Sequence, residues 1–340
     1  MTRILVTGAA GMIGYHLAAR LLADGHEIRG CDSFTSYYDI ALKEARSASL
    51  ASRFGFATDR VDLCDGPSFS DYYAVFKPEI VVHLAAQPGV RQGLEAPHQY
   101  VDSNLVGFTN VLDMCRRMPP RHLLYASSSS VYGANTVLPW SEEQPTEHPV
   151  SLYAATKKAN ELMAHSYSHI TGVAMTGIRF FTVYGEWGRP DMAPYKFASA
   201  VRAGKEITVY NHGKMSRDFT YVGDAVEALV RMMAVVPDRQ SAGLQGISPV
   251  APHRVINIGS GRPIHISDFI ALVEKVVDRK ARILYAARAA GDVVDSFAST
   301  QRLQELTGYV PDTPFETGLS KLCQWLDIYE SSARRAMTSS

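Results

Sequence analysis

The stretch RILVTGAAGMIGYHLAARLLADG, residues 3–25, decides the fold of this chain. It begins with a continuous apolar run over 3–8, which predicts a buried parallel strand. It continues with leucines at helical spacing over 14–25, where Gly25 ends the pattern. A strand that passes into a helix through a glycine-rich turn is the opening unit of an α/β sheet. The chain is therefore expected to go on alternating strands and helices.

The expected alternation continues to about residue 180. Apolar runs predict further strands at 26–32, 56–65, 79–86, 121–128, 172–180 and 255–261. Helices are predicted at 100–118, 151–170 and 318–332. Strands that alternate with helices predict a doubly wound parallel sheet with right-handed crossovers. After residue 179 the pattern loosens, which predicts a second, smaller domain on the carboxyl side of the sheet.

Composition excludes several classes of protein. Lys plus Arg and Asp plus Glu number 34 each, so no net positive charge attracts nucleic acid or anionic lipid. No run approaches the roughly 20 apolar residues that span a membrane, and the apolar N-terminal run is too short for a secretion signal. The four cysteines are far apart, which predicts no metal site and buried thiols in a reducing cytoplasm.

The glycine turn TGAAGMIG, residues 7–14, predicts a dinucleotide site. Gly8 allows a tight turn, Gly11 allows backbone N–H groups to approach a pyrophosphate, and Gly14 lets the helix pack on the strand. The first helical turn, with Met12 and Ile13, would then face the phosphates. The spacing is GxxGxxG and not GxGxxG, so a plain packing turn is the alternative.

Asp32 favours NAD as the dinucleotide. It ends the second predicted strand, 18 residues after Gly14, where an acid binds the adenosine ribose and repels a 2′-phosphate. Ser33 follows it, and not an arginine that would favour NADP. Asp62 and Leu63, at the end of the third strand, are expected to hold adenine, with a simple turn as the alternative for Asp62. The expected Rossmann domain is 1–178 with returning segments near 220–260, and the substrate domain is 179–219 and 261–332.

A tyrosine, a lysine and a serine run predict acid–base chemistry. Tyr153 and Lys157 are four residues apart, which places them on one helix face. An ammonium near a phenol lowers its pKa, so Tyr153 can act as general base and then as general acid. Ser128 follows a predicted strand, at the edge where parallel sheets bind ligands, and can hydrogen-bond the reacting oxygen. Ser129 and Ser130 would line the substrate pocket, and a capped turn is the alternative. His83 is expected to be structural.

These motifs together resemble the extended short-chain dehydrogenase/reductase family that acts on nucleotide sugars. The resemblance covers nearly the whole chain and includes LAAQ (84–87), SSSSVYG (127–133) and RFFTVYGEWGRPDM (179–192). The chain is most similar to the UDP-glucuronate 4-epimerase group, because SYYDIALKEAR (36–46) and SRDFTYVGD (216–224) resemble its longer signatures.

The resemblance implies an isomerase with bound NAD that interconverts UDP-glucuronate and UDP-galacturonate through a transient 4-keto sugar. Residues 128–133 offer no carboxylate, which disfavours the dehydratases and decarboxylases of the family. A UDP-glucose 4-epimerase and a UDP-glucuronate decarboxylase stay as alternatives. A non-catalytic NAD sensor is disfavoured because Tyr153 and Lys157 are both present.

The resemblance also implies further site residues. Arg189 is expected at the substrate carboxylate and Arg217 at the diphosphate, with a surface arginine as the alternative for each. Further cofactor contacts are expected from Ala85, Ala86, Gln87, Asn104 and Ser127, and further substrate contacts from Thr182, Lys196 and Asp292. A homodimer is expected through the helices at 100–117 and 151–170, with candidate contacts at Leu105, Val111, Leu112, Ala155, Leu162 and Met163.

Overall fold

The computed structural model describes residues 1–241, 243–288 and 293–338. Within this part of the chain, seven strands form one parallel sheet. They are β1 (Arg3–Thr7), β2 (Glu27–Asp32), β3 (Asp59–Arg60), β4 (Ile80–His83), β5 (His122–Ser128), β6 (Met175–Phe180) and β10 (His253–Ile258). Their order is β10-β6-β5-β4-β1-β2-β3. The expected doubly wound parallel fold is confirmed.

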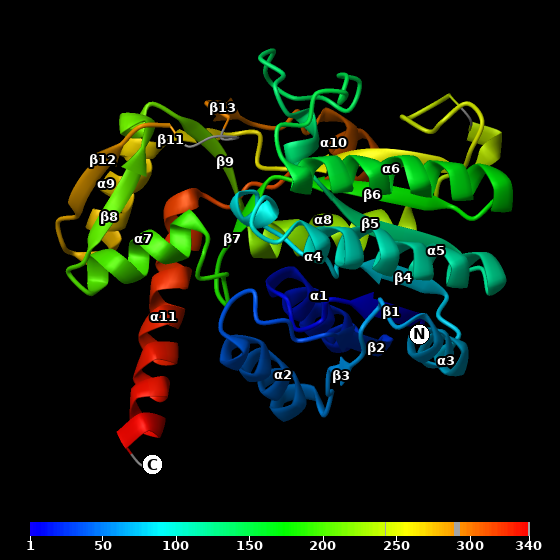
Figure 1. Ribbon diagram of the computed structural model, residues 1–340, viewed down its shortest axis with the longest axis horizontal. Helices are drawn as coiled ribbons and strands as arrows, with labels where there is room; N and C mark the ends of the chain where they lie inside the picture. Colours follow the sequence, from blue (N-terminus) through cyan, green and yellow to red (C-terminus); the bar gives the residue numbers. More distant parts are fainter. Residues whose placement is uncertain (242, 289–292, 339–340) are drawn as a thin grey trace.

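Helices cover both faces of the main sheet (Figure 1). One face carries α1 (Met12–Ala23) and α8 (Val222–Ala234), with α2 (Ile40–Phe54) beside α1 and α10 (Gln301–Thr307) beside α8. The other carries α3 (Gly66–Phe76), α5 (Gly107–Arg117) and α6 (Leu152–Thr171), which pack in that order. The short helix α4 (Pro97–Val101) runs through a π-helical turn, Asp102–Val106, into α5.

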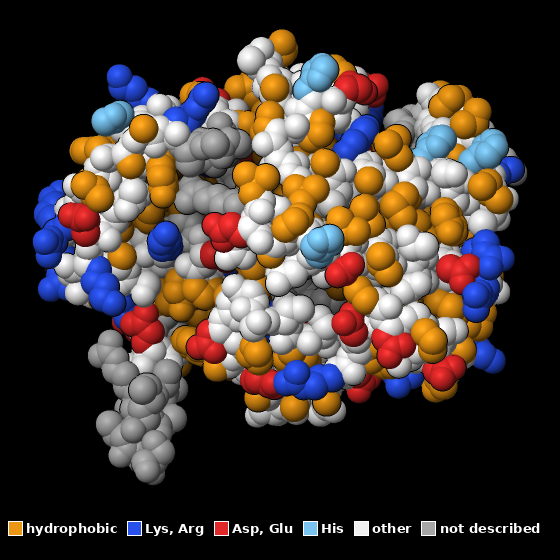
Figure 2. All heavy atoms as spheres, in the orientation of Figure 1, with side chains coloured by type: hydrophobic (Ala, Val, Ile, Leu, Met, Phe, Trp, Pro, Cys, Tyr) orange, Lys and Arg blue, Asp and Glu red, His pale blue; other side chains and the backbone are white. Residues whose placement is uncertain are grey.

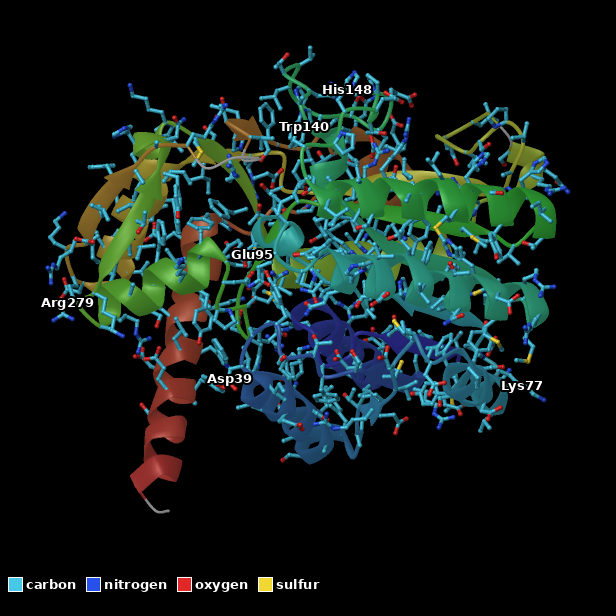
Figure 3. All side chains as sticks on the ribbon, viewed as in Figure 1. Asp39, Lys77, Glu95, Trp140, His148 and Arg279 are labelled. Atoms are coloured by element: carbon cyan, nitrogen blue, oxygen red, sulfur yellow. The ribbon has the colours of Figure 1, made fainter. Side chains whose placement is uncertain are left out.

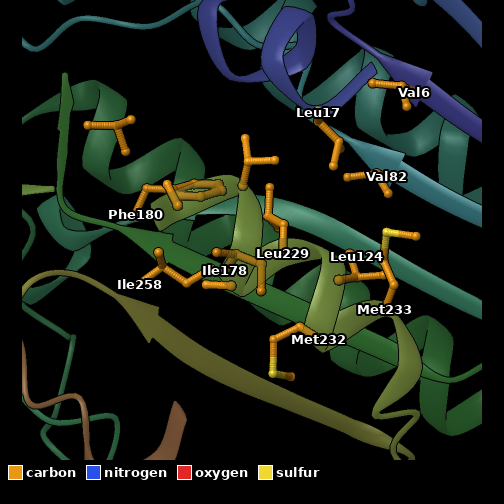
Figure 4. Close-up of a cluster of buried hydrophobic side chains, with 14 of the residues drawn as sticks. Val6, Leu17, Val82, Leu124, Ile178, Phe180, Leu229, Met232, Met233 and Ile258 are labelled. Carbon is orange, nitrogen blue, oxygen red and sulfur yellow. The ribbon is translucent and has the colours of Figure 1, made fainter. Parts of the chain in front are cut away.

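Alternation along the strands builds a separate core on each face of the sheet. Ile4 and Val6 on β1 point to the α1 and α8 side and belong to the buried cluster that includes Leu17 of α1 and Leu229 of α8. Figure 4 shows Val6, Leu17 and Leu229 within this cluster. Leu5, between them, points to the opposite side with Phe108 of α5. Strands buried on both faces need continuous apolar sequence, which is why 3–8 reads as one apolar run.

A smaller lobe follows β6 along the chain. Its strands are β7 (Thr182–Tyr184), β8 (Glu206–Tyr210), β9 (Ser216–Tyr221), β11 (Pro263–His265), β12 (Arg282–Ala286) and β13 (Asp295–Ser296). Its helices are α7 (Ala193–Arg202), α9 (Ile266–Val277) and α11 (Phe315–Thr338). Aromatic rings of Phe197, Phe219 and Phe269 pack at its centre. In Figure 1 the lobe stands beside the carboxyl ends of the main strands, and α11 extends away from it.

Besides α10, three helices of the main unit are not among the predicted elements. Two of them, α2 and α3, begin at Asp39 and Asp65, whose side chains accept hydrogen bonds from backbone N–H groups of the first turn. The third, α8, lies in the region where the sequence pattern loosens, yet it packs against α1 on the main sheet. Its buried face includes Val226, Leu229 and Met233.

Several expectations about single residues need correction. Cys31, Cys115 and Cys323 are buried thiols as expected, but Cys64 is only partly buried. Val111 and Leu112 are fully buried residues of α5 that pack into the core and cannot contact a second copy. Among the described residues, no helix is long and apolar enough to cross a membrane. In the same residues, no group of three or more His, Cys, Asp or Glu side chains is arranged to hold a metal ion.

Candidate functional site

One cavity of about 780 Å³ lies beyond the carboxyl ends of the main strands and extends to the smaller lobe. The strand order turns there, because β1 lies between β2 on one side and β4 on the other. Such a switch point is where open α/β sheets bind ligands. Figure 3 shows Glu95, in the segment before α4, on the side where the sheet meets the smaller lobe.

The glycine turn forms one end of the cavity. Gly8 has φ +72°, and a Cβ there would lie 2.7 Å from the backbone nitrogen of Ala85. A Cβ on Gly14 would lie 2.1 Å from the carbonyl oxygen of Gly8. Gly11 caps α1, and Met12 and Ile13 of its first turn also line the cavity. The turn therefore presents bare backbone and a helix N-terminus, which fits the pyrophosphate of a dinucleotide.

Asp32 lies beside a lysine that sequence reasoning missed. Its Oδ1 accepts a hydrogen bond from the Phe34 N–H at 2.8 Å and lies 3.8 Å from Nζ of Lys43. The side chains of Asp32 and Lys43 are 9% and 8% exposed, and both line the cavity. Burial lowers the pKa of Lys43, and Asp32 opposes that shift. The signal was present in SYYDIALKEAR, because Lys43 follows the Asp39 cap by four residues and so lies in the first turns of α2.

The loops after β3 and β4 form a wall of the cavity and carry the next group of predicted residues. Asp62 and Leu63 line the cavity, although Oδ1 of Asp62 also accepts the Cys64 N–H at 2.9 Å as a turn residue does. Ala85, Ala86 and Gln87 line it as well. Asn104 is not among the lining residues. Its Oδ1 accepts the Gln87 N–H at 2.8 Å and its Nδ2 donates to the Gln87 carbonyl at 3.1 Å, so it holds this wall from behind.

The four serines lie at the end of β5 and take different roles. Ser127 and Ser128 are on the strand, and Ser129 begins a 3-10 turn. Oγ of Ser128 accepts the Ser130 N–H at 3.1 Å and donates to Oγ of Ser130 at 3.1 Å. The run is thus a capped turn, and all four serines also line the cavity.

A buried ion pair anchors this strand end. Oγ of Ser127 donates to Oε1 of Glu161 on α6 at 2.7 Å. Arg179 on β6 donates to both carboxylate oxygens of Glu161, at 2.8 and 2.9 Å. Burial acts to raise the pKa of Glu161, but Arg179 holds it below its usual value. The pair ties α6, β5 and β6 together directly behind the serines.

Tyr153 and Lys157 both line the cavity from α6. The structure corrects the expectation that Lys157 lowers the pKa of Tyr153. Burial raises the pKa of Tyr153, while Ser128 and Arg189 act to lower it. Nζ of Lys157 donates to the carbonyl of Ala126 at 2.8 Å, and burial lowers the pKa of Lys157 to about 7.

His83 has the structural role expected of it. Its Nδ1 lies 2.8 Å from Oγ1 of Thr7, and its ring stacks on Phe108 with centroids 5.1 Å apart. Burial lowers the pKa of His83 to about 3, so the ring is neutral at physiological pH. It is not among the residues that line the cavity.

The smaller lobe and the segment after β7 supply the other end of the cavity. Thr182, Arg189, Lys196 and Arg217 all line it. Nη1 of Arg217 donates to the carbonyl of Val294 at 2.8 Å, and its Nη2 donates to that of Val293 at 2.8 Å, which fixes its direction. Arg189 is paired with Asp191, which sequence reasoning missed and which also lines the cavity. Asp292 lies outside the described residues.

Comparison with known proteins places this geometry in a family. Residues 4–259 match the NAD dependent epimerase/dehydratase family. A probable UDP-glucuronate 4-epimerase of Rhizobium meliloti (strain 1021) is 45% identical over 99% of both chains. UDP-glucuronate 4-epimerase 4 of Arabidopsis thaliana is 42% identical over 98% of this chain and 77% of its own length.

A solved structure agrees with these relatives. The crystal structure of UDP-glucuronic acid 4-epimerase from Bacillus cereus, in complex with UDP-glucuronic acid and NAD, superposes with a TM-score of 0.85. It is 28% identical, and the match covers 96% of this chain and 99% of that one. The chain, with its glycine turn, its strand-end serines and its Tyr-Lys pair around one cavity, belongs to the NAD dependent epimerase/dehydratase family.

Proposed function

We propose that this protein is a UDP-glucuronate 4-epimerase that uses bound NAD to invert C4 of the sugar. The observation that carries the proposal is one continuous cavity, lined at one end by the glycine turn and Asp32 and at the other by Ser128, Tyr153 and Arg189. The relatives named UDP-glucuronate 4-epimerase support the choice of sugar. We assign NAD to 1–178 with segments near 220–260, and the UDP-sugar to 179–219 and 261–332, apart from α10, which packs beside α8 on the main sheet.

The cofactor end of the cavity is assigned to NAD. The backbone around Gly8, Gly11 and Gly14 receives the pyrophosphate, Asp32 the adenosine ribose, and Asp62 and Leu63 the adenine. Ala85, Ala86, Gln87, Ser127 and Lys157 lie along the path to the nicotinamide end, with Asn104 behind Gln87. Bound NAD supplies a reversible hydride acceptor for C4.

The chain's own residues move the proton and hold the sugar. Tyr153 takes the proton of the C4 hydroxyl and returns one to the oxygen after the 4-keto sugar has turned over, and Ser128 hydrogen-bonds that oxygen. Ser128 and Arg189 both favour the charged form of Tyr153 against the effect of burial. Ser129 and Ser130 line the sugar pocket, with Arg189 as the cation for the sugar carboxylate, while Thr182, Lys196 and Arg217 bind the diphosphate.

The carboxylates of the cavity favour epimerisation over elimination. The lining residues that the structure describes include three acidic side chains, Asp32, Asp62 and Asp191. The first two are at the cofactor end, and the third is paired with Arg189. The strand end itself is lined by hydroxyls and not by an acid that would take a proton from C5.

A product assay tests the proposal. Purified protein is incubated with UDP-glucuronate, and the sugar nucleotides are separated. The expected product is UDP-galacturonate, formed until the two epimers reach a constant ratio with no added oxidant. Release of carbon dioxide with a pentose product would instead identify a decarboxylase. Turnover of UDP-glucose with none of UDP-glucuronate would identify a UDP-glucose 4-epimerase.

We propose a homodimer formed by α5 and α6 and the turn before α5. Val106 before α5 and Leu162 and Ile170 on α6 are 43%, 62% and 74% exposed, and Leu105, Ala155 and Met163 are partly exposed beside them. Figure 2 shows hydrophobic side chains over the part of this face where α5 and α6 lie. Antiparallel helix pairs from two copies would bury this surface.

We propose that the protein works in the cytoplasm on a small substrate, without nucleic acid or membrane. Four cysteines that form no disulfide among the described residues suit a reducing compartment. The balanced charge of the chain offers no general attraction to a polyanion. Fractionation of the source cell, with detection of this chain, tests the location.

A further inference from the structure

Arg189 already holds a carboxylate, and it belongs to the chain itself. Nε of Arg189 donates to Oδ1 of Asp191 at 3.0 Å, and Nη2 donates to Oδ2. This two-point geometry is the one that a guanidinium offers to any carboxylate, including that of a sugar acid. The side chains are 21% and 34% exposed, and both residues line the cavity. In the described structure, Asp191 therefore occupies this edge of the Arg189 guanidinium.

Asp191 has a second donor within reach. The hydroxyl of Tyr37 donates to Oδ2 of Asp191 at 3.2 Å. Tyr37 comes from the segment between β2 and α2, on the other wall of the cavity, and its ring lies 5.4 Å from the guanidinium carbon of Arg189. Burial raises the pKa of Tyr37 to about 12, so it stays a donor at neutral pH. Asp191 can thus leave Arg189 without losing every hydrogen bond.

The pairing matters because the charge of Arg189 is largely withdrawn from water. A guanidinium in such a place is costly unless a carboxylate accompanies it. A sugar with a hydroxymethyl group at C6 brings no charge, so Asp191 must stay. A sugar with a carboxylate at C6 brings its own negative charge. Two carboxylates cannot share one edge of Arg189 without repulsion.

We propose that Asp191 is an internal counter-carboxylate, which holds Arg189 when the sugar is absent or neutral and yields it to a sugar carboxylate. Tyr37 receives the displaced Asp191. Asp191 therefore makes the cavity tolerant of neutral UDP-sugars and limits its preference for acidic ones. The inference rests on the proposed UDP-sugar site, and it adds a specificity-determining residue to that site.

The competing account is that Asp191 only orients Arg189. The two accounts predict opposite signs for Asp191→Asn, which keeps the shape of the side chain and removes its charge. If Asp191 competes with the sugar carboxylate, the loss of its charge strengthens the binding of UDP-glucuronate and weakens the binding of UDP-glucose. If Asp191 only orients Arg189, the loss of its charge weakens the binding of UDP-glucuronate and leaves the binding of UDP-glucose unchanged.

The experiment is calorimetric binding of the two UDP-sugars to the NAD-loaded protein. The measured quantity is the Kd for UDP-glucose divided by the Kd for UDP-glucuronate. We expect Asp191→Asn to raise this ratio by about 10-fold, the size of one charge-assisted contact. Tyr37→Phe should lower it, because displaced Asp191 then lacks its second donor. An unchanged or lower ratio in Asp191→Asn would overturn the proposal.

Two controls keep the result specific. Asp113→Asn removes an acid of α5 that pairs with surface arginines, and the ratio should equal that of the wild type. In an Arg189→Ala background the effect of Asp191→Asn should vanish, because the two act as a pair. A persistent effect there would overturn the proposal. Binding requires no turnover, so failure of the proposed epimerase reaction would appear separately, in the product assay of the wild type.

Discussion

Tyr153 and Lys157 share a helix face, a cavity and a common physical constraint, which is burial. Burial favours the neutral form of each, so it raises the pKa of the phenol and lowers that of the ammonium. Ser128 and Arg189 act in the other direction on Tyr153. In the proposed reaction, the groups that favour the charged form of the phenol are therefore Ser128 and Arg189.

Tyr153→Phe tests the proton transfer alone, because the ring is kept and only the hydroxyl is lost. We expect turnover of UDP-glucuronate to fall at least about 100-fold, the usual contribution of a general acid–base group. The Kd for UDP-glucuronate should change little. Both are measured on one preparation, by product analysis and by calorimetry. Turnover close to that of the wild type would remove Tyr153 from catalysis.

Lys157→Met tests the cost of burying the ammonium. The folded pKa of Lys157 is about 7, below the 10.5 of the free side chain, so the unfolded chain binds more protons between these values. The destabilisation is fully present below pH 7 and is relieved as pH rises towards 10.5, by about 1.4 kcal/mol per pH unit.

The comparison that checks this cost is the unfolding free energy of nucleotide-free wild type and Lys157→Met at pH 7 and pH 9. The variant should be more stable relative to the wild type at pH 7, and its advantage should shrink by roughly 2–3 kcal/mol at pH 9. Other titrating groups are common to both chains and cancel. A difference that does not vary with pH would show that Lys157 stays protonated in the folded chain and that its pKa is not lowered.

The carboxyl ends of the strands decide what each element contributes to the cavity. Asp32 ends β2, the serines end β5, and Thr182 begins β7 directly after β6. The lysine of α2 reaches the same place as Asp32 because its helix packs beside α1. Strand ends and one helix therefore assemble a charged pair at the cofactor end that no single element contains.

Asp32→Ala should change the preference between the two dinucleotides. The carboxylate proposed to accept the ribose hydroxyls is lost, so NAD should bind at least about 10-fold more weakly, as for a charged hydrogen bond. Lys43 loses its carboxylate partner beside the same position, so the affinity for NADP should rise relative to the affinity for NAD. Direct titration with NAD and with NADP gives the two affinities, and the nucleotide released on denaturation shows which one the purified protein retains. Asp59→Ala, which removes an acid of β3 paired with Arg29, should leave them unchanged.

Sequence predicted the elements whose pattern is continuous and the site residues that are neighbours in sequence. The strands of 3–8 and 121–128 are apolar on both faces, so one run reveals them. By contrast, α3 is rich in aromatic and small residues, GPSFSDYYAVF, which form helices poorly in isolation, and tertiary packing decides it. Lys43 was not assigned because its partner Asp32 lies on another element. Asp191 is only two residues from Arg189, but the sequence does not show that the two side chains pair or that Tyr37 reaches them.

At the scale of the molecule, exposed apolar side chains on α6 have no cover in the single chain. Leu162→Glu places a charge at the centre of the proposed dimer surface. The mass measured by light scattering should be about twice the 37.3 kDa of one chain for the wild type. For the variant it should be the mass of a single chain. Val75→Glu on α3, a site that is 77% exposed, should leave the mass unchanged. A wild type that scatters as a single chain at micromolar concentration would end the proposal.

The chain passes repeatedly between the main sheet and the smaller lobe. It leaves the sheet after β6, returns at α8 and β10, leaves again at β11, returns at α10 and ends in α11 against α7 and α9. No single cut of the gene therefore separates the main sheet with its helices from the smaller lobe. Exchange of one continuous segment of the gene cannot replace the whole smaller lobe, because the lobe is built from several separate segments of the chain. If Arg189 and Asp191 set the sugar preference as proposed, that preference can change by point substitution at these two positions within an otherwise intact chain.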